Sequence, residues 1–215
     1  MKVYLYICCL SLCTNLYQAQ YNTNAVQDSF ERVIALESND SIKVRHIAKF
    51  ISETKSKNEN EILSLFDQGK KLCEALGLEE LLYSLYIEIS TKLSKIGFQD
   101  QSQSKCEELM DLLYAQPKLN IEYYSRGQLL LARYDTEQGR LKSADGRIES
   151  VIDIHHDIEP TVHLVLAYNE KSITLRNQGI LEEALTYSDS AIVVCNIIED
   201  ISQKANVYSG RGRVY

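Results

Sequence analysis

The sequence predicts an all-helical protein built from a repeated helical pattern. Only 9 of the 215 residues are glycine and 2 are proline, and the apolar–polar alternation typical of strands is hard to find. Small and apolar residues instead recur at helical spacing, and glycines that end such stretches recur about every 40 residues, at Gly97, Gly139 and Gly179. We therefore expect consecutive helix pairs that stack on one another.

The stretch from Gly179 to Ile192 shows the repeated unit most clearly. A glycine ends one helical pattern, and Ala184, Tyr187 and Ala191 then lie with Ile192 on a single face of the next helix. Two of these residues are alanines, so a neighbouring helix can approach closely.

The helix that ends at Gly179 has a counterpart 82 residues earlier. Each carries a large aromatic residue, a small residue, a leucine and a closing glycine at identical spacing: Tyr86, Ser90, Leu93 and Gly97 in one, and Tyr168, Ser172, Leu175 and Gly179 in the other. Glu88 also matches Glu170. A third copy, with Gly139 and Ala144 in place of Gly179 and Ala184, lies between them.

This pattern resembles the tetratricopeptide repeat (TPR), in which bulky and small residues let two antiparallel helices interlock and the next pair stack on them. The resemblance implies a right-handed superhelical solenoid over residues 42–215. Its last repeat is truncated after Tyr208, Gly212 and Tyr215, which fit the aromatic, glycine and aromatic positions of another first helix.

Some features depart from the TPR pattern. Gln128 stands where the first aromatic residue of the third pair is expected, and Lys57 where the turn glycine of the first pair is expected. The spacing of about 40 residues exceeds the TPR length and lies where HEAT and armadillo repeats begin. The Gly-x-x-x-x-Ala turns after Gly139 and Gly179 favour TPR over HEAT.

Residues 1–20 have the build of a secretory signal peptide. Lys2 is the only charged residue, Val3 to Cys13 is an apolar run, and Thr14 to Gln20 becomes polar with Ala19 near its end. The run is too short for a membrane-spanning helix. We therefore expect an exported protein.

Other interpretations of this segment stay open. It can be an ordinary amphipathic first helix, in which case residues 1–20 are retained and the protein is cytoplasmic. Leu10 to Cys13 also resembles a lipoprotein attachment site, although Leu12 is too large for it. Residues 21–41 are expected to form a segment with one short helix, Ser29 to Leu36, and Asp40 or Ser41 is expected to cap the following helix.

The charge and the cysteine spacing argue against two classes of function. A net charge of −7 argues against a general electrostatic surface for nucleic acid. Cys73, Cys106 and Cys195 have no metal-type spacing and are expected to be buried apolar residues.

No nucleophile stands beside a base, and Gly210-Arg211-Gly212 lacks the spacing of a dinucleotide loop, so close helix packing is its favoured interpretation. We expect no enzyme activity and no cofactor.

The histidines are the remaining candidates for a metal site. His155, His156 and His163 lie close in sequence, but adjacent histidines on a helix point in different directions. Solvated histidines at a helix end are the favoured interpretation. Asp153 and Asp157 are expected to raise the pKa of these histidines if the carboxylates lie close to the imidazole rings. No metal is therefore expected.

Binding is the positive expectation. In stacked TPR pairs the first helices line a concave groove, so their residues outside the packing positions are candidate contacts. These candidates are Lys95, Arg133, Asn169, Arg176, Asn177 and Arg213. Arginine and asparagine can hold a peptide backbone or a carboxylate; simple solvation of the surface is the alternative. Ile173 replaces an asparagine expected one turn after Asn169, so the basic clamp of chaperone-binding TPR proteins is not reproduced.

The whole arrangement resembles the extracytoplasmic sensor regions of bacterial two-component histidine kinases and related helix-turn-helix regulators. The resemblance implies a non-catalytic module that binds a protein or peptide, in the periplasm or another extracytoplasmic space. It implies membrane attachment only through the signal peptide or a further C-terminal region. The alternative is a free-standing exported scaffold or assembly adaptor. The exposed last repeat also suggests a homo-oligomer.

Overall fold

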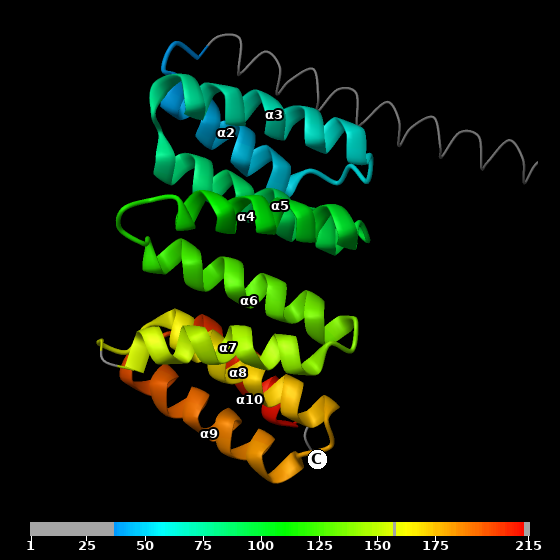
Figure 1. The fold of residues 1–215 in the computed structure, drawn as a ribbon, viewed down its shortest axis with the longest axis vertical. Helices are drawn as coiled ribbons and strands as arrows, with labels where there is room; N and C mark the ends of the chain where they lie inside the picture. Colours follow the sequence, from blue (N-terminus) through cyan, green and yellow to red (C-terminus); the bar gives the residue numbers. More distant parts are fainter. Residues whose placement is uncertain (1–36, 157, 213–215) are drawn as a thin grey trace, which may run out of the picture. The chain divides into compact units, whose positions relative to one another are not determined.

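The computed structural model describes residues 37–156 and 158–212, and every regular element in this part of the chain is an α-helix (Figure 1). The helices are α2 (Asp40–Glu53), α3 (Glu59–Leu76), α4 (Glu79–Ile96), α5 (Gln99–Tyr114), α6 (Ile121–Glu137), α7 (Leu141–His156), α8 (Val162–Asn177), α9 (Leu181–Ile197) and α10 (Ile201–Gly212). The all-helical prediction is confirmed for this part. None of these helices is both long enough and apolar enough to cross a membrane.

The helices follow the predicted order. We call α2, α4, α6, α8 and α10 the first helices, because they occupy the places predicted for the first member of each pair. The predicted signal peptide, the short helix from Ser29 to Leu36, and Arg213 and Tyr215 lie outside the described residues.

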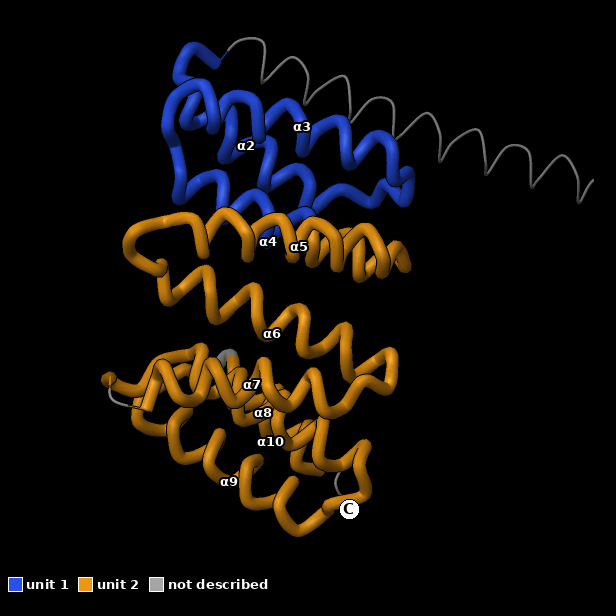
Figure 2. The backbone as a smooth tube through the Cα atoms, in the orientation of Figure 1, with its two compact units in different colours: residues 1–89 blue, residues 90–215 orange. Residues whose placement is uncertain are grey.

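The chain divides into two compact units, residues 1–89 and 90–215 (Figure 2). In the described part of unit 1, α2 packs on α3, and Phe66 of α3 meets Tyr86 of α4 edge to face, with 4.9 Å between ring centroids. A Cβ atom on Gly69 would come within 2.8 Å of Leu85 and 3.3 Å of Ile47. Gly69 therefore lets the helices approach closely.

In unit 2, each described helix from α5 onward packs on the one that follows it in sequence, and α8 also contacts α6 and α10. The apolar core of the third pair includes Ala132, Ala144, Ile148 and Val151. The fourth pair and α10 share a second cluster that includes Val165, Ala191, Cys195 and Val207. The alanines at positions 144, 184 and 191 are fully buried, which explains their predicted spacing.

The ends of the helices are largely those that the sequence predicts. Gly77, Gly97, Gly139 and Gly179 all have positive φ, as closing glycines do. Glu199, just after α9, has a φ of 55° and adopts the same left-handed conformation without being glycine. It is the one such non-glycine residue in the described part of the chain.

The predicted cap of α2 is wrong by one residue. Asn39 is the N-cap, and its side-chain Oδ1 accepts a hydrogen bond of 3.2 Å from the backbone N–H of Ile42. Asp40 is the first helical residue and pairs with Lys43. Asn58 caps α3 in the same way, so that helix begins at Glu59.

Candidate functional site

A hollow of about 290 Å³ lies in unit 2 between side chains of three first helices. Its polar and small lining residues are Arg133 from α6, Asn169 and Glu170 from α8, and Gln203, Asn206, Ser209 and Gly210 from α10. Its apolar lining residues are Leu166, Ile173 and Val207. We call this the α8 hollow, because α8 contacts both of the other helices that line it.

An ion pair joins two walls of the α8 hollow. Arg133 donates hydrogen bonds from Nε, at 3.1 Å, and from Nη2 to the same carboxylate oxygen, Oε1 of Glu170. Glu170 is 3% exposed, whereas the Arg133 side chain is 53% exposed. The Glu170 charge raises the pKa of the Arg133 guanidinium, and burial opposes this rise. The arginine therefore neutralises a buried acid and still faces solvent.

Asn169 is the second predicted residue in the α8 hollow. A Cβ atom on Gly210 would come within 2.8 Å of Asn169 Oδ1, so glycine lets α10 approach this amide. Close packing was predicted for Gly210-Arg211-Gly212; it holds at Gly210, whereas Gly212 is exposed and a Cβ atom there would meet nothing within 4 Å. Among the described residues, none hydrogen-bonds to the Asn169 side chain, so its donor and acceptor remain available.

The structure brings two of the six predicted contact residues together. Arg133 and Asn169 line the α8 hollow. Arg176 is half-buried in the last turn of α8, and Asn177 is exposed at its end; neither lines the hollow. Lys95 is exposed in the last turn of α4, and Arg213 lies outside the described residues.

Four polar lining residues were missed. Gln203, Asn206 and Ser209 lie on α10, the helix that the sequence presented only as a truncated repeat. Glu170 was noticed for its match with Glu88, and that recurrence was the available signal of its role.

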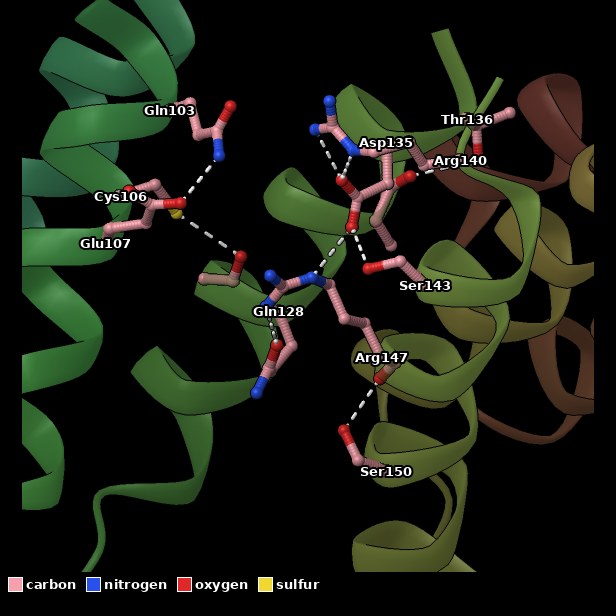
Figure 3. A network of polar contacts seen from close by, with 12 residues as sticks. Gln103, Cys106, Glu107, Gln128, Asp135, Thr136, Arg140, Ser143, Arg147 and Ser150 are labelled. Carbon is pink, nitrogen blue, oxygen red and sulfur yellow. Dashed lines mark hydrogen bonds and ion pairs between the residues drawn. The ribbon is translucent and has the colours of Figure 1, made fainter. Parts of the chain in front are cut away.

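A second polar cluster lies within the third pair (Figure 3). Asp135 of α6 is buried and accepts hydrogen bonds from Arg140 Nε at 2.8 Å, Ser143 Oγ at 2.7 Å and Arg147 Nε at 2.9 Å. Burial would raise the pKa of the Asp135 carboxyl, but these hydrogen bonds outweigh burial and hold its pKa below the ordinary value. The carboxylate is therefore committed to holding α6 against α7.

The same cluster explains why Gln128 replaces an aromatic residue. Arg147 Nη1 donates to Gln128 Oε1 at 3.0 Å, and Gln128 Nε2 donates to the Tyr114 hydroxyl at 3.3 Å. Gln128 is buried, so its amide provides the polar partners that Arg147 and Tyr114 need. A local hydrogen-bond network takes the place of ring packing here.

The prediction for His155 is wrong. His155 is 2% exposed rather than solvated, and burial lowers its pKa. Burial also lowers the pKa of His163, whose ring centroid lies 5.8 Å from that of His155. Asp153, which was expected to raise these pKa values if it lay close, is exposed and contributes to neither shift, and Asp157 lies outside the described residues.

The hydrogen bonds of His155 fix its tautomer. Ser125 Oγ lies 2.9 Å from His155 Nε2 but donates its own proton to the carbonyl of Ile121 at 2.7 Å. His155 Nε2 must therefore carry the proton and donate to Ser125, and Nδ1 accepts from the Thr161 hydroxyl at 3.2 Å. This serine–histidine contact holds α6, α7 and the start of α8 together and does not activate the serine.

The three described cysteines behave as predicted. Cys73, Cys106 and Cys195 are buried and form no disulfide with one another. Burial raises the pKa of the Cys73 thiol to about 11 and that of Cys106 to about 12, so neither is a ready nucleophile. In residues 37–156 and 158–212, no group of three or more histidine, cysteine or acidic side chains is arranged to hold a metal ion.

Comparison of the chain with protein-family models, with curated proteins and with solved structures finds no match. The resemblance to TPR proteins therefore stays a prediction from the residues themselves.

Proposed function

We propose that this chain is a non-catalytic helical repeat module that binds a protein or peptide segment in the α8 hollow. The observation that carries the proposal is the set of polar groups that three successive first helices direct to one place. Asn169 offers a carbonyl oxygen and an amide that no described residue occupies. An extended peptide presents the complementary N–H and C=O groups along its backbone.

The ion pair supports a ligand that is recognised mainly by its backbone. Glu170 neutralises Arg133, so the hollow does not present an uncompensated cation to a free carboxylate. Arg133 is half exposed and has N–H groups beyond the two that Glu170 accepts. These donors can bind a peptide carbonyl at the edge of the hollow, while Leu166 and Ile173 contact an apolar side chain.

The same proposal includes the finer architecture, a right-handed solenoid of TPR-like pairs. Three observations support it: the closing glycines share one conformation, the alanines at the predicted small positions are buried, and α8 contacts both neighbouring first helices in unit 2. In such a solenoid, first helices line the surface that binds ligands.

The lack of a catalytic role is part of the proposal. The groups that most resemble catalytic ones are engaged in structural hydrogen bonds: Asp135 binds three side chains, and Ser125 gives its proton to a backbone carbonyl. A general base or nucleophile needs a free lone pair or an activated proton. The Asp135 carboxylate is occupied by its donors, and the Ser125 hydroxyl faces the protonated nitrogen of His155 instead of a base.

For the wider role, we propose that the module is the sensory or interaction region of a larger bacterial signal-transduction protein, exported to the periplasm. This rests on the resemblance of the whole sequence to sensor regions of histidine kinases and helix-turn-helix regulators. The alternative is a free-standing exported scaffold or assembly adaptor. Sequencing the gene beyond the codon for Tyr215 discriminates between them, because only the first requires a signalling domain there.

A peptide-selection experiment tests the binding function. The full chain is used to select binders from a display library of random twelve-residue peptides, and the affinity of each binder is measured by fluorescence anisotropy. We expect Asn169→Ala and Asn206→Ala to weaken binding, whereas Glu182→Ala, at an exposed position of α9, leaves it unchanged. Failure to select any peptide, or selected peptides that respond only to Glu182→Ala, would contradict the proposal.

A further inference from the structure

Unit 1 has a hollow of its own, of about 280 Å³, between α2 and α4. Its polar lining residues are Arg45, Lys49 and Ser52 from α2 and Ser84 and Glu88 from α4. Val44 and Ala48 of α2 and Leu81 of α4 provide apolar surface. We call this the α2 hollow. No sequence pattern singled out either of its cations.

The α2 hollow is equivalent to the α8 hollow in the repeat. Ser84 and Glu88 of α4 stand 82 residues before Leu166 and Glu170 of α8, which is the offset between Gly97 and Gly179. All four line their respective hollows. The same face of a first helix is therefore hollowed in each unit, with a glutamate at the same register.

The charge of the two hollows differs. In the α8 hollow, Arg133 is paired with Glu170. In the α2 hollow, Arg45 and Lys49 are both exposed, and neither charged side chain forms a hydrogen bond or ion pair with any residue in the described part of the chain. They stand four residues apart on α2, so both side chains lie on one face.

Glu88 does not cancel this charge. It is a single carboxylate on the opposite wall, against two cations, and it has an interaction of its own. The α2 hollow is therefore a locally cationic site in a chain whose net charge is −7. Such a site attracts anionic groups that the rest of the surface repels.

We propose that the α2 hollow binds an internal segment of a partner protein in which acidic side chains flank an apolar one. The Arg45 guanidinium can hold a carboxylate through two parallel hydrogen bonds, and the Lys49 ammonium can hold a second. Val44, Ala48 and Leu81 contact the apolar side chain between them.

The length of the α2 hollow fits a short extended segment. The lining residues of α2 run from Val44 to Ser52, which is about 12 Å along the helix axis. A peptide of about four extended residues covers this length. The site shares with the proposed function the idea that first helices bind peptides, but it uses different residues and can be tested separately.

An array of random nine-residue peptides with both termini blocked, probed with the full chain, tests this assignment. We expect a subset of peptides to bind the wild type about tenfold better than Arg45→Gln/Lys49→Gln. The loss of each exposed charge should weaken binding about threefold, and the two losses multiply. These peptides should contain aspartate or glutamate next to a large apolar residue. Their binding should weaken when sodium chloride is raised from about 50 mM to about 300 mM.

Two controls separate the possible causes. Lys57→Gln/Lys71→Gln removes two exposed unit 1 charges outside the hollow and should leave binding unchanged. Asn169→Ala should also leave it unchanged, so a failure at the α8 hollow is distinguishable from a failure here. The assignment is overturned if no peptide distinguishes the double variant, if distinguishing peptides are not acidic, or if a twelve-nucleotide single-stranded DNA binds as tightly through Arg45 and Lys49.

Discussion

Arg133 on α6 donates two hydrogen bonds to one carboxylate oxygen of Glu170 on α8. This relationship links two successive first helices inside the candidate binding hollow and spans 37 residues of sequence. It also places a buried negative charge next to a partly exposed positive one. The ion pair therefore contributes both to the packing of unit 2 and to the surface that a ligand meets.

Removing the arginine should leave an unpaired buried acid. We expect Arg133→Met to lower the free energy of unfolding by about 2 kcal/mol, less than the 3–5 kcal/mol typical of fully buried pairs, because Arg133 is half exposed. Arg133→Met/Glu170→Leu should recover most of the loss, since no charge is left unpaired. Urea unfolding of the three proteins measures this. A double variant that is less stable than Arg133→Met contradicts it.

The hydrogen-bonded cluster around Asp135 should contribute strongly to the free energy of unfolding. Asp135→Asn keeps the shape but removes the charge that faces Arg140 and Arg147, and we expect a loss of about 3 kcal/mol. Asp153→Asn, on exposed α7 surface, serves as the matched control and should change stability by less than about 0.5 kcal/mol. Equal effects of the two substitutions on the urea midpoint would show that the cluster carries no special energy.

Glu199 offers a stabilising substitution. A non-glycine residue in the left-handed region destabilises the folded state by about 1–2 kcal/mol. Glycine removes this strain, but its larger loss of backbone entropy on folding costs about 0.5–1 kcal/mol. We therefore expect Glu199→Gly to raise the free energy of unfolding by about 0.5 kcal/mol. Gly139→Ala, at a φ of 73°, should lower it. Thermal unfolding should place the two variants on opposite sides of the wild type.

The buried histidines predict the direction of pH dependence. Burial lowers the pKa of His155 and His163 from the ordinary value of 6.5, so the unfolded chain takes up protons more readily than the folded one. The stability that the neutral, buried imidazoles allow is fully present above about pH 6.5. It is lost as the pH falls from there toward the lowered pKa values. Stability at pH 7.5 should therefore exceed stability at pH 5.5.

Substitution identifies the groups responsible. His155→Gln and His163→Gln should each flatten the dependence of unfolding free energy on pH in this window. Urea unfolding at both pH values provides the measurement. A wild type that is more stable at the lower pH would contradict the burial of neutral imidazoles.

The repeat pattern was sufficient to predict the helical class and most helix ends. Each repeat needs a closing glycine and a buried alanine at the same places, because each packs on its neighbours in the same way. The positions of Gly139 and Ala144 could therefore be predicted from those of Gly179 and Ala184. The cap of α2 was misplaced because Asn39, Asp40 and Ser41 are all good capping residues, and only backbone geometry selects among them.

The candidate site was only partly predictable. Arg133 and Asn169 were found because they fall outside the packing positions of their helices. The burial of His155 depends on Ser125, 30 residues earlier, and helical periodicity carries no information on such a contact. Arg45 and Lys49 looked like ordinary surface charges, since their lack of partners and the hollow beside them are visible only in three dimensions.

The most direct test of the central claim compares two glycines of α10. Gly210→Ala should push the Asn169 amide out of the α8 hollow, because the new Cβ would lie 2.8 Å from Asn169 Oδ1, whereas Gly212→Ala meets nothing within 4 Å. Both changes replace glycine by alanine in the last turn of α10. With a selected twelve-residue peptide, anisotropy should show binding about tenfold weaker for Gly210→Ala, equivalent to about one lost hydrogen bond. Equal affinity of the two variants would contradict the proposal that peptides bind in the α8 hollow.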